Sequence, residues 1–290
     1  MEHLRDWIGR SETRGDDATA APVAGLNATL DRDDPHPMPG SDVPPLGHWL
    51  YFTPLTQQSQ IDADGHAKRG DFLPPVPLPR RMWAGGRLEF LHPLRIGDEL
   101  IRTSRIADVS VKSGRSGELV FVTVRHEISN ARGMAITEEH DIVYRDEPSP
   151  GALPPTPQAA PVDETFSRLI TPDSVLLFRY SALTFNGHRI HYDRPYVTQV
   201  EGYPGLIVHG PLIATLLMDL VRRQFPEARV VRFSFKALRP IFDIQTFTVC
   251  GRVETDLGNG HRRVQLWTRD NDGWLTMQAT ADITGTQPSS

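Results

Sequence analysis

The second half of the chain has a regular pattern of apolar and polar positions. A segment from Ser174 to Thr184 has the composition of a helix, and Thr171 or Asp173 is suited to cap its start. A longer segment, from Leu212 to Phe225, follows Gly210-Pro211 and is apolar over most of its circumference. Proline is favourable at the first helical position because the N–H that it lacks would be unpaired there. A helix that is apolar on nearly all sides must be buried.

Four segments after this helix alternate between apolar and polar residues with the period of two that is typical of strands. They include residues 231–237, 247–251, 264–268 and 275–283. A buried helix followed by an antiparallel meander predicts a sheet wrapped around that helix, which is an α+β layout.

The first half of the chain has a similar order of predicted elements. Residues 88–94 align with residues 235–241 without a gap, at an offset of 147 (235 minus 88), and a predicted hairpin around Gly133 matches one around Gly273. We therefore infer a duplicated unit. The first half lacks a long apolar helix. The candidates for an eroded equivalent are Leu46, Trp49, Leu50 and Phe52.

Proline-rich stretches divide the chain. Residues 32–47 and 65–80 are rich in Pro, Gly and Asp, and we expect long loops there. Residues 147–163 contain six prolines and predict a stiff, extended linker. We therefore expect an N-terminal unit over residues 1–146 and a C-terminal unit over residues 164–290. In this interpretation the second unit carries the site, while the first completes the sheet and the pocket.

Composition excludes several classes of function. A net charge of -5 argues against a nucleic-acid partner, because binding phosphates requires a basic face. The lone Cys250 excludes an intrachain disulfide and a cysteine-based zinc site, and its strand-like surroundings favour a packed thiol. The first residues have no apolar signal region, and no stretch reaches the roughly 20 apolar residues of a membrane span. We expect a soluble, cytoplasmic protein without membrane contact.

Candidate chemistry gathers around the apolar helix. His188, His191 and His209 lie near it in sequence, and His is the useful base at neutral pH. Asn186 lies five residues before His191, so both side chains can face one small ligand. Gly210 offers a backbone N–H at the start of a helix. A base, a polar orienter and an anion-stabilising N–H are the set that is needed for chemistry beside a thioester carbonyl.

Three segments resemble the MaoC-like (R)-specific hydratase family. Residues 178–193 contain ALTFNGHRIHYD, residues 201–220 read EGYPGLIVHGPLIATLLMDL, and residues 70–90 resemble the N-terminal half of its double-hotdog branch. That branch holds itaconyl-CoA and mesaconyl-C4-CoA hydratases, and hydroxyacyl-thioester dehydratases of type 2 are near relatives. The likeness covers residues 45–285. It implies an α+β double hotdog that hydrates an acyl-CoA thioester without a metal or redox cofactor, as a monomer or a homodimer.

The resemblance also suggests roles for single residues. In the family pattern D-x-N-P-aliphatic-His, an Asp and a His hold and activate the water. His191 matches the His, but Asn186 occupies the Asp position, and an amide cannot accept a proton. The acid–base duty then rests on His191 alone, or Asp193 contributes. Gly210 matches the family's oxyanion donor.

Structural interpretations stand beside these roles. Asn186 also suits a helix cap or an Asx-turn, and Gly210 a tight helix start. His188 and His209 are expected to be structural. His188 and His191 lie three residues apart, but no Cys or Glu completes a metal-ligand pattern with them, so we expect no metal. Arg80 and Arg81 are either solvated charges or contacts for CoA phosphates or a substrate carboxylate. Further candidates for a substrate carboxylate are Arg179, Arg189 and Arg239.

Three other functions remain open at this point. One is a 3-hydroxyacyl-thioester dehydratase of fatty-acid synthesis, which works in the reverse direction on a carrier protein. The second is a non-catalytic acyl-CoA-binding hotdog module, in which Asn186 marks lost activity. A thioesterase is also compatible with the fold, whereas a Ser-His-Asp hydrolase lacks its nucleophile motif.

Overall fold

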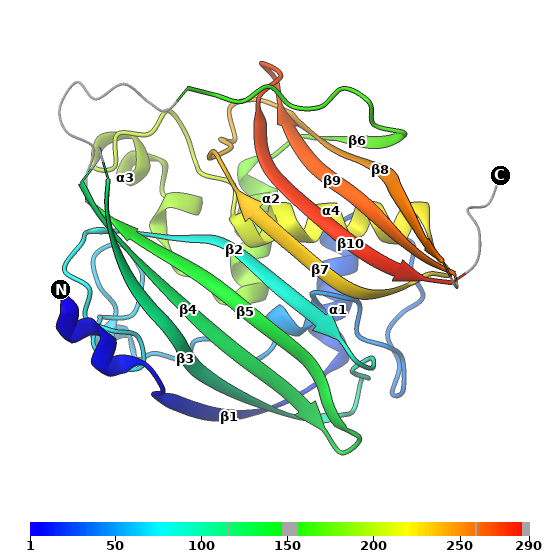
Figure 1. Ribbon diagram of the computed structural model, residues 1–290, viewed down its shortest axis with the longest axis horizontal. Helices are drawn as coiled ribbons and strands as arrows, with labels where there is room; N and C mark the ends of the chain where they lie inside the picture. Colours follow the sequence, from blue (N-terminus) through cyan, green and yellow to red (C-terminus); the bar gives the residue numbers. More distant parts are fainter. Residues whose placement is uncertain (115–116, 147–155, 259, 286–290) are drawn as a thin grey trace.

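The computed structural model describes residues 1–114, 117–146, 156–258 and 260–285 (Figure 1). The strands are β1 (Ser11–Asp17), β2 (Arg80–Phe90), β3 (Glu99–Gly114), β4 (Gly117–Asn130), β5 (Gly133–Arg145), β6 (Phe166–Ile170), β7 (Arg229–Ala237), β8 (Phe247–Gly258), β9 (His261–Asp270) and β10 (Leu275–Thr284). The helices are α1 (Ala20–Thr29), α2 (Ser174–Thr184), α3 (Arg194–Gln199) and α4 (Gly210–Gln224), and short 3-10 helices span Glu2–Trp7, Gly47–Leu50, Gln58–Gln60 and Arg189–His191. No helix of the described residues is long and apolar enough to cross a membrane.

Within the described residues, ten antiparallel strands form one sheet in the order β1-β3-β4-β5-β2-β7-β10-β9-β8-β6. Each half of the chain contributes five neighbouring strands, and the halves join where β2 pairs with β7, at the middle of the sheet in Figure 1. A Cβ at Gly85 would lie only 2.5 Å from the backbone oxygen of Phe235. The close approach of the two strands therefore requires glycine at this position.

The two halves repeat one topology outward from this junction. The order β2-β5-β4-β3-β1 on one side corresponds to β7-β10-β9-β8-β6 on the other. Strand β2 ends at Phe90 and β7 at Ala237, which are 147 residues apart (237 minus 90). Tight turns at Gly133 and Gly273, both with positive φ, close the hairpins β4–β5 and β9–β10. The duplicated unit inferred from the sequence is confirmed.

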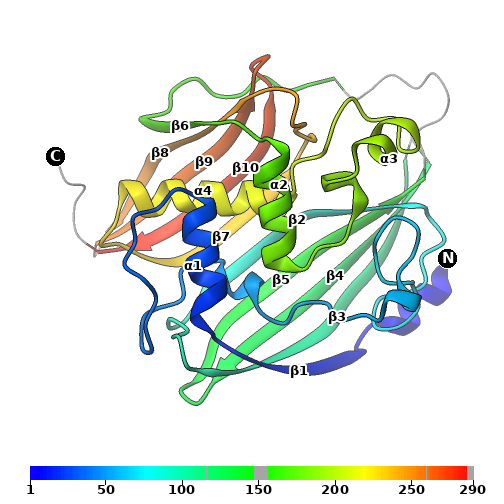
Figure 2. The same ribbon diagram turned by 180° about the vertical axis from the view of Figure 1, so that it is seen from behind.

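Helix α4 lies against one face of the sheet, with α1 and α2 on the same side (Figure 2). Every residue from Leu212 to Val221 is buried, as the all-round apolar sequence predicted. Helix α2 also has its predicted bounds, and the Asp173 carboxylate caps it by accepting the N–H of Leu176. The sheet thus wraps around a buried helix, which is the predicted layout.

The helical segment of the first half lies elsewhere than the sequence suggested. Between Leu46 and Phe52 the chain forms only a short 3-10 helix, although both of these side chains are buried. The regular helix is α1, which follows β1 as α2 follows β6. The absence of a side chain at Gly25 lets α1 approach Leu183 of α2 closely. Short side chains and Pro22 conceal this helix from a search for apolar periodicity.

The predicted linker is described only in part, because residues 147–155 lie outside the described residues. Residues 156–163 do not extend freely but run along β9 and β10. The N–H of Ala160 donates to the carbonyl of Gly273, and the indole of Trp267 donates to that of Pro161. The division into units at residues 146 and 164 stays a prediction.

Cys250 lies under this linker segment. Its thiol is fully buried in a small cluster with Ala160, Trp267 and Leu275. The expectation of a packed thiol is confirmed.

A buried carboxylate ties the far end of α4 to its surroundings. Asp219 accepts hydrogen bonds from Arg32 at 2.6 Å, from Arg168 of β6 at 3.0 Å and from Arg223 at 2.7 Å. Its side chain is only 1% exposed. The buried charge of Asp219 depends on these three guanidinium groups, because a buried ion is stable only when it is paired.

We expect Asp219→Asn to lower the free energy of unfolding by about 3–5 kcal/mol, because the buried side chain loses three charge-assisted hydrogen bonds from guanidinium groups. Urea denaturation measures the change. The control is Glu89→Gln, which breaks the exposed ion pair with Arg232 on the sheet surface and should cost less than about 1 kcal/mol. Equal losses in the two variants would contradict the assignment.

Candidate active site

The turn after α2 carries the candidate residues. Helix α2 ends at Phe185, which has a φ of 50°, and the N–H of Asn186 donates to the Ser181 carbonyl. A 3-10 helix over Arg189–His191 follows, and Asp193 caps α3 by accepting the N–H of Tyr196. These two caps hold the ends of the turn and fix the place of His191 between them.

His191 is held in one tautomer. Its Nδ1 donates to the backbone carbonyl of Ile207 at 2.7 Å, so Nε2 carries the lone pair. The side chain is buried, and this burial lowers the pKa of His191 to about 4. The imidazole is therefore neutral at physiological pH and can accept a proton at Nε2.

The ring of His191 lies at the start of α4. It stacks on the ring of His209, with the centroids 3.7 Å apart and the planes 18° from parallel. His209 is fully buried, is hydrogen-bonded to the Ser181 hydroxyl at 2.8 Å, and is the residue just before Gly210. The N–H of Gly210 belongs to the first turn of the helix and has no partner within the helix. The structure thus stacks the predicted base on the residue that directly precedes the predicted oxyanion donor.

Asn186 shapes the turn. Its side-chain oxygen accepts the backbone N–H of His188 at 3.0 Å, which is an Asx-turn. The predicted Asx-turn is therefore confirmed, and the side-chain oxygen of Asn186 forms it. A catalytic role for its amide stays a prediction.

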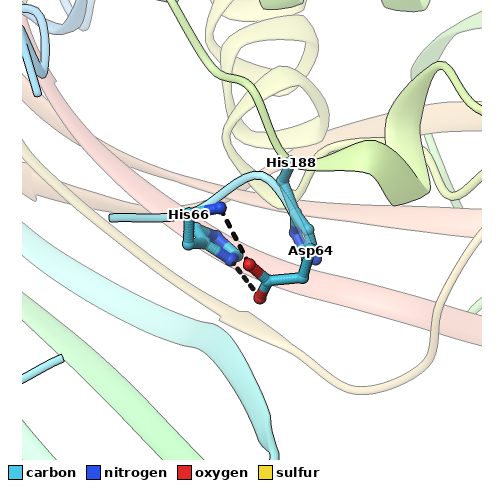
Figure 3. Close-up of side chains that lie close together, drawn as sticks. All are labelled: Asp64, His66 and His188. Carbon is cyan, nitrogen blue, oxygen red and sulfur yellow. Dashed lines mark hydrogen bonds and ion pairs between the residues drawn. The ribbon is translucent and has the colours of Figure 1, made fainter. Parts of the chain in front are cut away.

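A loop from the first half supplies polar groups that the sequence did not reveal. His66 donates to Asp64 from Nδ1 at 2.8 Å and from its backbone N–H at 2.9 Å. The centroids of the His66 and His188 rings lie 3.9 Å apart, and those of the His188 and His191 rings lie 5.4 Å apart. Figure 3 shows Asp64, His66 and His188. A series of imidazoles therefore leads from the loop to the candidate base.

Backbone contacts hold this loop in place. Ile61 and Ala67 form an isolated bridge that closes it, and the N–H of Arg189 donates to the Asp64 carbonyl at 2.9 Å. A Cβ on Gly65, whose φ is +92°, would lie 1.8 Å from the carbonyl oxygen of Gly187. The two halves thus meet through glycine backbone, so no side-chain pattern in the sequence could indicate the contact.

The predicted substrate-binding arginines differ in their surroundings. Arg80 stacks over Tyr203 and donates to its hydroxyl, and Arg189 pairs with Asp193 at 2.8 Å. Arg81 lines a cavity of about 290 Å³ beside His66. Arg179 lies on the exposed side of α2, and Arg239 follows the end of β7. Of the five, Arg81 is the one that borders this cavity.

Asp64, His66 and His188 could also hold a metal ion. Their ligand atoms lie within 4.8 Å of one another. The expectation of no metal considered only ligands close to His188 in sequence, and the structure adds Asp64 and His66 from far along the chain. Both carboxylate oxygens of Asp64 accept hydrogen bonds from His66, so an ion would have to displace one of these.

A second buried polar network lies in the first half. Glu138 is 2% exposed and accepts hydrogen bonds from His48 at 2.9 Å, Trp49 at 2.8 Å and His140 at 2.5 Å. The neighbouring imidazoles of His140 and His48 hold the pKa of Glu138 well below its usual range, despite its burial. Trp83 packs on His140, with ring centroids 4.1 Å apart, and its carbonyl borders Gly210. Through Trp83, the network supports the backbone that borders the start of α4.

Comparisons with known proteins identify the family of this chain. A family model described as hydroxyacyl-thioester dehydratase type 2 matches residues 46–243. A mesaconyl-C(4)-CoA hydratase of Chloroflexus aurantiacus is 46% identical over 279 residues, which cover 96% of this chain and 97% of the relative.

Solved structures show the same fold. A MaoC-like dehydratase aligns over 98% of this chain and 100% of its own, with a TM-score of 0.71 at 14% identity. A Mycobacterium tuberculosis protein described as having a double hotdog fold aligns over 96% of each chain, with a TM-score of 0.62 at 13% identity. The predicted α+β double hotdog is confirmed.

We expect kcat/KM for crotonyl-CoA to fall as the pH decreases through about 4, because protonation of His191 removes the base. Above that pH the imidazole is neutral, so the acid limb should not lie near 6.5, the ordinary pKa of His. Initial rates across the pH range measure this, with circular dichroism at each pH as a control for folding. A midpoint near 6.5 in a folded protein would contradict the assignment.

We also expect Gly65→Ala to destabilise the protein more than Gly40→Ala. Both glycines have positive φ, so each alanine costs about 1–2 kcal/mol of backbone strain. A Cβ at Gly40 meets nothing within 4 Å, whereas at Gly65 it displaces the loop from Gly187. Thermal melts and hydratase rates of the two variants test this, and equal losses would show that the loop does not dock as described.

Proposed function

Because the chain belongs to the hydroxyacyl-thioester dehydratase type 2 family and is an enzyme of the hydro-lyase class, we propose that it catalyses the reversible addition of water to an enoyl-CoA thioester. The observation that carries this proposal is the stack of His191 on His209 at the start of α4. In our proposal, the neutral imidazole of His191 acts as the base and the N–H of Gly210, the residue after His209, acts as the oxyanion donor, which are the two groups that the reaction requires.

The reaction begins with polarisation of the thioester. Its carbonyl oxygen accepts the N–H of Gly210, and the positive end of the α4 dipole lies behind that group. Water attacks the β-carbon while Nε2 of His191 takes one of its protons. The electron pair of the double bond moves to the thioester oxygen as an enolate. Each oxyanion donor contributes about 10²–10³-fold to the rate of such reactions.

Transfer of the proton to the α-carbon completes the addition. A lowered pKa makes the protonated His191 a strong acid, so it can return the proton to the enolate and become neutral again. The Asx-turn formed by Asn186 holds His188 and the following 3-10 helix, which positions this ring. In the cycle that we propose, all protons come from the water that is added, and no metal or redox cofactor takes part.

The substrate that we propose is mesaconyl-C4-CoA, which gives citramalyl-CoA on hydration. The relative that is 46% identical supports this choice, because it is a mesaconyl-C(4)-CoA hydratase. Itaconyl-CoA, which would give the same product, is the second candidate. A cytoplasmic location and a monomeric or homodimeric double hotdog belong to the proposal and rest on the sequence.

Two other functions make different predictions. A 3-hydroxyacyl-thioester dehydratase of fatty-acid synthesis is favoured by the description of the family model, and it would prefer acyl carrier protein and long acyl chains. A non-catalytic acyl-CoA-binding module would bind enoyl-CoA without turnover, in the wild type and in His191→Ala alike. Assays with both carriers separate these functions from the proposed one.

We expect His191→Ala to lower turnover at least about a hundredfold with little change in folding, because it removes the base. Asn186→Ala should cost less. Asn186→Asp should retain or raise activity, since a carboxylate can also accept the His188 N–H. The loss of the thioester enone absorbance measures hydration of crotonyl-CoA, mesaconyl-C4-CoA and itaconyl-CoA. Near-normal activity of His191→Ala would remove this residue from the mechanism.

A further inference from the structure

We propose that the side chain of His209 is a second oxyanion donor, whose imidazole N–H binds the thioester oxygen together with the backbone N–H of Gly210. The inference rests on the proposed function, because that function places the thioester oxygen at Gly210. The sequence alone predicts a structural role for His209. The proposal instead gives this side chain a direct contact with the reacting group.

The hydrogen bond between His209 and Ser181 assigns the tautomer of His209. Nε2 lies 2.8 Å from the Ser181 hydroxyl, which has no other hydrogen bond among the described residues. Ser181 is buried, and a buried hydroxyl that donates to nothing is unfavourable, so it donates to Nε2. Burial lowers the pKa of His209 well below its usual value, so the ring is neutral. Because a neutral imidazole has one N–H, the proton is on Nδ1.

This Nδ1 has no hydrogen-bond partner within the part of the chain that the structure describes, although the side chain is fully buried. The ring of His191 lies almost parallel to that of His209, so an N–H in the plane of one ring is not directed at the other. The neighbouring Tyr180 uses its hydroxyl on Thr215. A buried donor of this kind is rare in folded proteins, and a ligand atom that accepts it would account for it.

The place of this donor in the chain fits an oxyanion site. His209 directly precedes Gly210, so the two N–H groups belong to adjacent residues at the positive end of the α4 dipole. There is also room beside Gly210. Apart from its own helix and its chain neighbours, a Cβ there would meet within 4 Å only the carbonyl oxygen of Trp83, at 3.8 Å. A substrate oxygen in this space can accept both donors.

The role of His209 follows from the charge that develops during hydration. The thioester oxygen is a neutral carbonyl in the substrate and becomes an enolate when water attacks the β-carbon. Both donors therefore bind it more strongly in the transition state than in the substrate. His209 keeps its proton throughout, and the proton that reaches the α-carbon still comes from His191.

Two substitutions separate the two ring nitrogens, because the amide nitrogen of Asn takes the place of Nδ1 and that of Gln takes the place of Nε2. His209→Gln keeps a partner for Ser181 but removes the donor, so kcat for crotonyl-CoA should fall about 10²–10³-fold. His209→Asn keeps the donor and loses the Ser181 contact. It should be at least about tenfold faster than His209→Gln, since it retains a hydrogen bond to a charged oxygen.

The matched control is His92→Gln. Nε2 of His92 is also buried without a partner among the described residues, but this residue follows the end of β2 that is far from Trp83. Its kcat should equal that of the wild type. A fall as large as that of His209→Gln would show that the loss does not depend on the start of α4, and would contradict the inference.

Two spectroscopic measurements test the donor without turnover. NMR of the wild type with isotope-labelled histidine, assigned with His209→Gln, should show a protonated Nδ1 and an unprotonated Nε2. Infrared difference spectra should show the thioester C=O stretch of bound, unreactive butyryl-CoA at a lower frequency in the wild type than in His209→Gln. The reason is that two hydrogen bonds polarise the carbonyl more than one. The NMR measurement does not depend on the folding of a variant.

Three results would overturn the inference. They are a protonated Nε2 in the wild type, a C=O frequency that His209→Gln leaves unchanged, and a higher rate in His209→Gln than in His209→Asn. The last order is expected if His209 only holds the helix start through Ser181. Each result would leave the proposed function standing if crotonyl-CoA is hydrated in a His191-dependent way. A wild type that hydrates no enoyl-CoA would refute the proposed function, and this inference with it.

Discussion

The pairing of β2 with β7 is the constraint on which the rest of the structure depends. It makes one sheet from two similar halves, and it is possible only because Gly85 lets a neighbouring backbone come close. With the sheet continuous, the helices of both halves lie on one side of it. Trp83, just before the junction, then borders the start of α4. The pairing of β2 with β7 thus positions Trp83 next to the start of α4, where the proposed oxyanion donor Gly210 lies.

The sequence predicted the elements whose side chains have a clear period, and it missed what backbone contacts decide. The all-round apolar surface of α4 and the four strands after it were predicted correctly. Helix α1 was missed because its short side chains show no stripe. Asp64 and His66 could not be found, because 122 residues separate His66 from His188 (188 minus 66) and a contact between two glycines joins them.

The two buried polar networks of the molecule differ in their charge state. Around His191 the rings are removed from water with few charged partners, so they are neutral and can exchange protons. Glu138 is also buried, but it accepts three hydrogen bonds and is held as a carboxylate, so it does not exchange protons readily. One network is therefore suited to chemistry and the other to support. The difference lies in the number of hydrogen-bond donors, not in the depth of burial.

Joining two units in one chain has a consequence for how such a site can change over generations. In a symmetric pair of identical subunits, every substitution occurs twice, and each must be tolerated at both places. Here a mutation alters one side of the molecule alone. The loop that carries Asp64 and His66 can pack against the turn of the other half. No identical loop has to fit at the symmetry-related position. Tandem duplication thus allows an asymmetric pocket that fits an asymmetric ligand.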